Sequence, residues 1–175
     1  MKRAWLTALA VATGMSMASS MVAHPVAAGP AEHALLVSYI GDWRGESVLV
    51  GGERPEPFRC RLSVTQGNQS KINYAGRCSL VNMNLSVSGT IAYSDQNRRY
   101  EAAMSSNAGF TGMAVGQQRG NQIAFDLTQR ERDRGGNDVA IGSRIFLIND
   151  QITVEFQVEF NNSGDVMTAT VPFGR

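Results

Sequence analysis

Cys60 and Cys78 are the only cysteines in this 175-residue chain, and their chemistry is the best defined in the sequence. A pair of thiols can form a disulfide, bind a metal ion or supply a reactive thiolate. No second cysteine pair or nearby histidine accompanies them, so the sequence offers no support for a metal site or a reactive thiol. Two cysteines allow one intramolecular pairing, and we expect a structural disulfide.

The residues around the cysteines predict how the pair is brought together. A polar turn at Gly67–Ser70 separates two runs with alternating apolar residues, which is typical of a β-hairpin. If Gln66 faces Ile72 across this turn, the same register places Cys60 opposite Cys78. Directly opposed residues in an antiparallel pair are close enough for an S–S bond.

Other reactive groups are sparse. The chain has no G-x-S-x-G, no H-E-x-x-H and no glycine-rich phosphate loop, and its two histidines are His24 and His33. We therefore expect no enzymatic activity. The charged segment Arg130–Arg134 is a candidate partner contact, but mixed charges beside Gly135 are more typical of a solvated hairpin loop.

The N-terminus has the pattern of a secretory signal peptide. Lys2 and Arg3 precede an uncharged run over residues 4–23, and Val26, Ala27 and Ala28 follow as small residues. We expect a signal peptide over residues 1–28 with cleavage after Ala28, and Ala23 is the alternative cleavage site. Serine and threonine dilute the run, so a transmembrane anchor fits less well. We expect export to the periplasm or beyond, which permits a disulfide. Without Lys2 and Arg3 the chain is nearly neutral, with no large basic field for nucleic acid or anionic lipid.

The remaining chain predicts a single all-β domain. Short alternating runs are separated by turns rich in Gly, Asn and Asp, and this argues for an antiparallel up-and-down barrel of about 8 to 10 strands over residues 42–175. Residues 29–41 form a helical lead-in, in which Ala34, Leu35, Val37 and Ile40 could line one side. The predicted strands cover residues 43–50, 57–66, 71–81, 84–94, 98–105, 109–118, 121–129, 138–148, 151–160 and 165–173.

An outer-membrane barrel is the main alternative to this domain. Such a barrel presents an apolar band to lipid between girdles of aromatic residues. Only 7% of the residues are aromatic, and the strands carry charges such as Glu155, Glu159 and Arg98. We therefore expect no membrane insertion.

The segment Tyr39–Glu46, with the sequence YIGDWRGE, resembles the G-x-W-x-G opening of lipocalin-like (calycin-like) barrels. The stretch GDWRGE is also similar to the first strand of nitrobindin-type haem barrels, which have ten strands. Together with the Cys-Arg and Arg-Cys pairs, it resembles a group of uncharacterised exported alphaproteobacterial barrels. The resemblance implies that Trp43 closes one end of the barrel and that Gly45 permits close approach there.

The haem site of the nitrobindin-type barrels does not carry over. Those proteins bind iron through a histidine near the C-terminus, whereas no histidine follows His33 here. Tyr74, Tyr93, Tyr100 and Met104 are alternative iron ligands in principle, and no feature of the sequence singles one out. We expect no cofactor and no metal.

Two hypotheses of function remain. In the first, the barrel lumen holds a small apolar or amphipathic molecule such as a lipid, with the lumen residues drawn from Trp43, Tyr100, Met104, Phe156 and Val158. In the second, the interior is filled and the outer surface contacts an envelope protein, as an inhibitor or accessory, through the Arg130–Arg134 loop or the region of Pro55 and Pro57. Inward side chains that meet across the barrel would exclude the first hypothesis.

Overall fold

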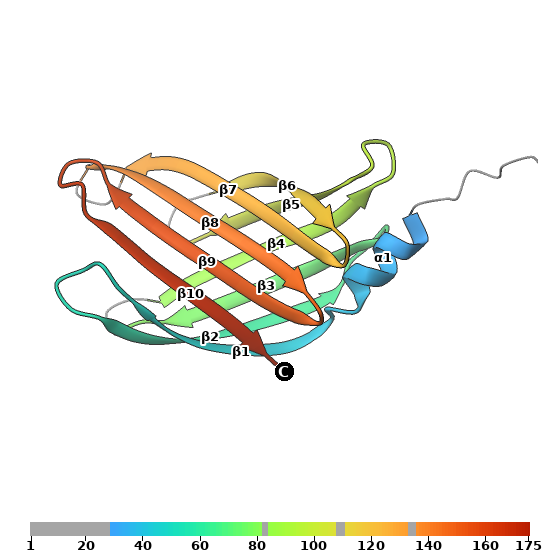
Figure 1. The fold of residues 1–175 in the computed structure, drawn as a ribbon, viewed down its shortest axis with the longest axis horizontal. Coiled ribbons are helices and arrows are strands. Elements are labelled where there is room, and N and C mark those ends of the chain that lie inside the picture. The colour runs from blue at the N-terminus through green and yellow to red at the C-terminus, as the bar shows by residue number, and fades with distance from the viewer. Residues whose placement is uncertain (1–28, 82–83, 108–110, 133–135) are drawn as a thin grey trace, which may run out of the picture.

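The computed structural model describes residues 29–81, 84–107, 111–132 and 136–175, and over these residues ten antiparallel strands close into a barrel (Figure 1). Each strand pairs with the next one along the chain, and β1 pairs with β10 to complete the ring. This confirms the predicted up-and-down barrel. The predicted signal peptide, residues 1–28, lies outside the described residues. The strands are β1 (Gly41–Leu49), β2 (Glu56–Gln66), β3 (Lys71–Ser79), β4 (Asn84–Ser94), β5 (Arg99–Ser106), β6 (Thr111–Arg119), β7 (Gln122–Arg132), β8 (Asp138–Ile148), β9 (Gln151–Phe160) and β10 (Val166–Gly174).

The hairpin of β2 and β3 has the register that the sequence predicts. Gln66 lies opposite Ile72, Cys60 lies opposite Cys78, and the two cysteines form a disulfide. The turn closes with the amide of Gly67 donating to the carbonyl of Lys71 at 2.8 Å. Because side chains alternate along a strand, this register also fixes which residues of the hairpin face the interior.

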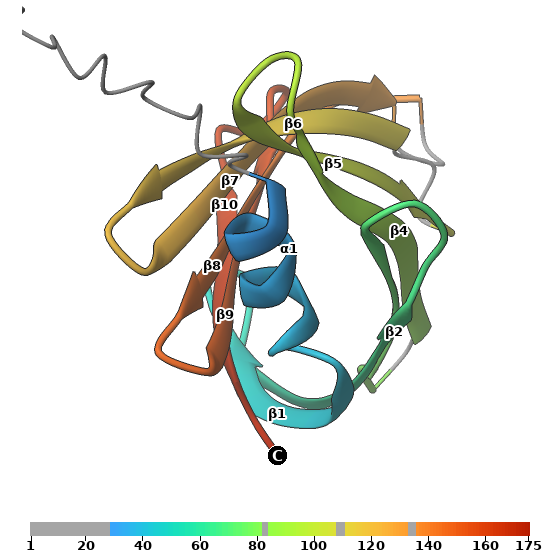
Figure 2. The same cartoon turned by 90° about the vertical axis from the view of Figure 1, so that its right-hand side faces the viewer.

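The single helix of the described residues, α1 (Gly29–Val37), lies across one end of the barrel (Figure 2). It begins next to Pro30, which fits the first turn of a helix, and it contacts β3 and β4. The predicted contact face is only partly correct. Leu36, which the prediction left out, is fully buried, while Ala34 is exposed. A helix that lies across the end of a barrel contacts it through a small part of its surface and not along one whole face. The spacing of apolar residues in the helix therefore does not identify the residues that contact the barrel.

The barrel interior is filled on one side. The inward residues of β6 are small, namely Gly112, Ala114 and Gly116. A Cβ atom at Gly116 would lie 2.6 Å from the ring of Phe125 and 2.7 Å from Tyr100, so both aromatic side chains occupy the space that this glycine leaves. Phe125 and Tyr100 are each 1% exposed. The wall around β5 to β7 is therefore packed, and open space remains on the other side of the barrel.

Candidate functional site

The candidate site is a cavity of about 820 Å³ inside the barrel. Its lining comes mainly from β1 to β4 and from β8 to β10, that is, from the side opposite the packed wall. A volume of this size is within the usual range for a ligand pocket. The inward-facing aliphatic and aromatic residues of this lining include Leu49, Phe58, Leu62, Val64, Ile72, Val87, Ile91, Ile141, Ile145, Leu147, Ile152, Val154, Met167, Val171 and Phe173.

The structure divides the five predicted lumen residues into two groups. Met104, Phe156 and Val158 border the cavity, whereas Trp43 and Tyr100 do not. Trp43 and Tyr100 are nearly fully buried in the protein below α1. These two rings fill the closed end of the barrel instead of lining the lumen.

The end of the barrel beneath α1 is closed by a layer of aromatic residues. The indole Nε1 of Trp43 donates to the carbonyl of Tyr39 at 3.0 Å, and the guanidinium of Arg175 lies 4.4 Å from the centre of the Trp43 ring. Tyr93 and Tyr100 pack edge to face with ring centres 5.0 Å apart. Trp43 thus lies at one end of the barrel, as the resemblance implied, and Tyr39 forms part of the cavity floor.

Gly45 allows β10 to approach β1 next to this layer. A Cβ atom at Gly45 would lie 2.7 Å from the side chain of Val171 and 2.9 Å from the carbonyl oxygen of Pro172. Real Cβ atoms do not approach other atoms this closely, so a larger residue would push the two strands apart. The close approach that the resemblance implied is therefore present.

The opposite end of the barrel is the mouth of the cavity. Asn84, Asn107 and Arg132 border the cavity at this end and are exposed, so the cavity reaches solvent there. Arg132 pairs with Asp138 at 3.2 Å between β7 and β8. The predicted Arg130–Arg134 loop is only partly a loop, because residues 130–132 are the last residues of β7. Residues 133 and 134 lie outside the described residues.

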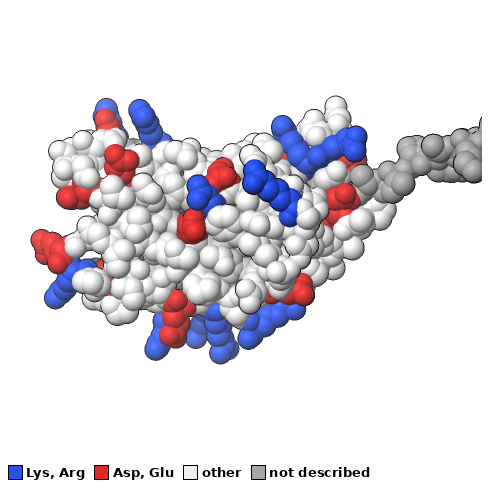
Figure 3. Space-filling view, viewed as in Figure 1, with Lys and Arg blue, Asp and Glu red and all other residues white. Residues whose placement is uncertain are grey.

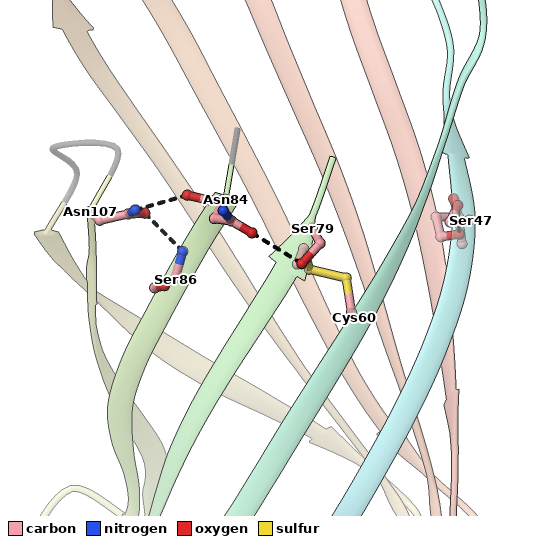
Figure 4. Close-up of a disulfide and its surroundings, with 8 residues drawn as sticks. Ser47, Cys60, Ser79, Asn84, Ser86 and Asn107 are labelled. Carbon is pink, nitrogen blue, oxygen red and sulfur yellow. Dashed lines mark hydrogen bonds between the residues drawn. A yellow bond between two sulfur atoms is a disulfide. The ribbon is translucent and has the colours of Figure 1, made fainter. Parts of the chain in front are cut away.

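A hydrogen-bonded group of polar residues ties the strands together at the mouth (Figure 4). The side chain of Asn107 accepts from the amide of Ser86 at 2.8 Å and donates to the carbonyl of Asn84 at 2.9 Å. The hydroxyl of Ser79 donates to the side chain of Asn84 at 3.0 Å. The disulfide lies beside this group and borders the cavity. This part of the rim is therefore held by both covalent and hydrogen bonds.

Within the cavity the polar groups are few. The hydroxyl of Tyr74 donates to the carbonyl of Ala103 at 3.3 Å, and burial raises the pKa of Tyr74 to about 12. Ser143 adds a second hydroxyl to the lining. Over the described residues no charged side chain is buried. The cavity can therefore hold an apolar body and offers little to stabilise a buried charge.

The described residues contain no group of three or more His, Cys, Asp or Glu side chains that could hold a metal ion. Among the possible haem ligands, the Tyr74 hydroxyl donates a hydrogen bond to the carbonyl of Ala103. Tyr93 and Tyr100 lie outside the cavity. Met104 borders the cavity. In the same part of the chain, no helix is long and apolar enough to cross a bilayer.

Comparisons with known proteins define the class of fold. No family model matches the sequence, and no curated protein matches it. Among solved structures, Rv2717c from M. tuberculosis is similar with a TM-score of 0.62 and 17% identity, over 83% of this chain and 97% of that chain. The S-type phycobiliprotein lyase CPES from Guillardia theta is similar with a TM-score of 0.52 and 14% identity, over 81% and 90%. The chain therefore shares a closed β-barrel fold with these two proteins.

Proposed function

We propose that this protein is an exported lipocalin-like binding protein that holds a small apolar or amphipathic molecule in its barrel. The observation that carries the proposal is the apolar cavity of about 820 Å³, closed by α1 and open at the other end. Burial of apolar ligand surface in such a cavity is favourable by roughly 25 cal/mol per Å². The polar residues of the mouth suit the polar end of an amphipathic ligand.

Three further points support the proposal. The first is the opening segment Tyr39–Glu46, which resembles the first strand of lipocalin-like exported barrels, including the alphaproteobacterial group. The second is the disulfide, which suits an oxidising compartment such as the periplasm. The third is the fold shared with a protein described as a phycobiliprotein lyase, although a shared fold alone does not transfer a function. We propose a binding role rather than catalysis for this chain.

The alternative, an interaction module with a filled barrel, is less well supported. It depends on inward side chains that meet across the lumen, and Val154, Phe156 and Val158 border open space instead. A contact between the outer surface and an envelope protein does not require a filled lumen, and the cavity does not support such a contact.

A fluorescent apolar probe tests the proposal. We expect 1-anilinonaphthalene-8-sulfonate or N-phenyl-1-naphthylamine to bind to the folded protein with micromolar affinity and a blue-shifted emission. Val158→Trp places a large ring in the cavity and should weaken binding at least tenfold. Gln157→Trp adds the same ring to the exposed neighbouring position on β9 and should leave the affinity unchanged. Equal affinities for the two variants would contradict binding in the lumen.

A further inference from the structure

Three arginines that are far apart in the sequence lie side by side on the outer wall of the barrel. Arg44 of β1 is directly opposite Arg61 of β2, and Arg61 is directly opposite Arg77 of β3. All three side chains are exposed. Arg61 and Arg77 also adjoin the cavity wall, but their neighbours Cys60 and Cys78 face inward, so by alternation the two guanidinium groups point outward. We call these three residues the arginine row.

Over the part of the chain that the structure describes, the arginine row forms no ion pair with an acidic residue. Among the described residues no carboxylate lies within 4.0 Å of any of its guanidinium groups, and the nearest acids along β1 are Asp42 and Glu46. Glu46 is paired with Arg59 at 3.0 Å. Lys and Arg side chains gather along the lower edge of the molecule in Figure 3, with some Asp and Glu side chains beside them, where β1 and β2 lie in the same view of Figure 1.

Such a row has a cost for the fold. Like charges directly opposite each other across a sheet are destabilising. The net charge of the sequence is close to zero and does not reveal the arginine row, because only the strand register brings the three arginines together. Because its guanidinium groups form no close ion pair, the row is able to bind an anion.

The disulfide holds part of the row in place. Arg61 and Arg77 directly follow and precede the two cross-linked cysteines, so the S–S bond on the inner face joins the same two backbones that carry this arginine pair. The strands cannot shift in register to separate the two charges. The backbone positions of Arg61 and Arg77 are therefore fixed before an anion arrives.

The surroundings of the row leave it open to a ligand. Arg77 faces Ser86 on β4, and Arg44 faces Gly174 on β10. On the side toward the Gly67–Ser70 turn, the next outward pair along β2 and β3 is Ser63 opposite Ala75. These residues are small, so they do not cover the guanidinium groups, and serine hydroxyls can add further hydrogen bonds to an anion.

From this geometry we infer that Arg44, Arg61 and Arg77 form a binding site for a phosphate-type oxyanion, separate from the cavity. Opposed residues have Cβ atoms about 5 Å apart, so three guanidinium groups can converge on one multivalent group. Carboxylates on one face of an extended acidic peptide recur about every 6.6 Å and carry one charge each, which matches the row less well. The phosphate group is either free in solution or part of a lipid headgroup.

Two sets of binding experiments on the mature chain test this site. In the first, inorganic phosphate is titrated and binding is followed by amide chemical shifts. In the second, vesicles of phosphatidylcholine with or without phosphatidic acid are tested by flotation. Arg61→Gln removes the centre of the row and should weaken binding at least tenfold, and Arg77→Gln should act in the same direction. Arg119→Gln changes an exposed arginine on β6, outside the row, and should have no effect.

Each outcome decides for or against the site. Phosphate binding that Arg61→Gln weakens supports a free anion, and binding only to phosphatidic acid vesicles with the same loss supports a lipid headgroup. An equal loss in Arg119→Gln, binding only to an acidic peptide, or no binding in either experiment overturns the inference. The melting temperature of Arg61→Gln should be unchanged or higher, which separates lost binding from lost folding. Val158→Trp should leave phosphate binding unchanged, so this test does not depend on the cavity.

Discussion

Tyr74 shows how a single side chain combines packing, hydrogen bonding and proton affinity in this barrel. Its ring faces inward from β3 and lies over Gly89 of β4, where a Cβ atom would overlap the Tyr74 ring and the carbonyl oxygen of Ala103. Glycine is therefore required at this position, and it lets the tyrosine hydroxyl reach Ala103 on β5. One inward tyrosine thus spans three neighbouring strands.

The raised pKa of Tyr74 predicts a loss of stability at high pH. The folded protein keeps the phenol proton up to about pH 12, whereas the unfolded chain releases it near pH 10. Between these values the folded state binds more protons, so the free energy of unfolding falls as the pH rises. The difference between the pKa values of Tyr74 in the folded and unfolded states corresponds to a loss of at most about 2 to 3 kcal/mol in the free energy of unfolding.

Urea denaturation at pH 9 and pH 11.5 measures this effect. Tyr74→Phe should lose about 1 kcal/mol at pH 9, because the hydrogen bond to Ala103 is absent. It should then lose less stability than the wild type on going to pH 11.5. Some loss of stability between pH 9 and pH 11.5 should remain in Tyr74→Phe, since burial also raises the pKa values of Tyr39 and Tyr100. The same drop in both proteins would contradict the assignment to Tyr74.

Among the elements, the β2–β3 hairpin is the part that the sequence predicts most completely. A polar turn of known length and strict alternation on both sides leave one register that buries the apolar residues, and this register pairs Cys60 with Cys78. The helix is less predictable, because its contact depends on where the barrel rim lies. The sequence identifies its position in the chain but not the dominant role of Leu36.

The disulfide should stabilise this hairpin mainly through the unfolded state. Closing a loop with a sequence separation of 18 contributes about 3 kcal/mol. We expect reduction, or the double change Cys60→Ser and Cys78→Ser, to lower the free energy of unfolding by about this amount. Alkylation without reductant should modify neither cysteine. Two alkylated cysteines in the native, unreduced protein would contradict the cross-link.

For the molecule as a whole, the sequence predicts the barrel but not the shape of its interior. Alternation identifies the inward residues, and Met104, Phe156 and Val158 do reach the cavity. The alternation does not show that large side chains pack against the small residues Gly112, Ala114 and Gly116 of β6. It also does not show that Trp43 and Tyr100 fill the closed end of the barrel. These features depend on contacts between strands that are distant in the sequence. The arginine row depends on register in the same way.

The inner and outer faces of the barrel wall over β1 to β3 differ in chemical character. The inner face of β1 to β3 borders an apolar cavity, and the outer face of the same strands carries the arginine row. Because side chains alternate along a strand, one set of strands can support both. A change on one face should leave the other face unaffected.

The central claim is that the open lumen holds a small apolar molecule. Native mass spectrometry of the protein isolated gently from the cells that produce it tests this claim most directly. We predict an additional mass of a few hundred daltons on the wild-type protein that is retained in Gln157→Trp and lost in Val158→Trp. A wild-type protein that carries no added mass after isolation and after incubation with cell lipids would contradict the claim.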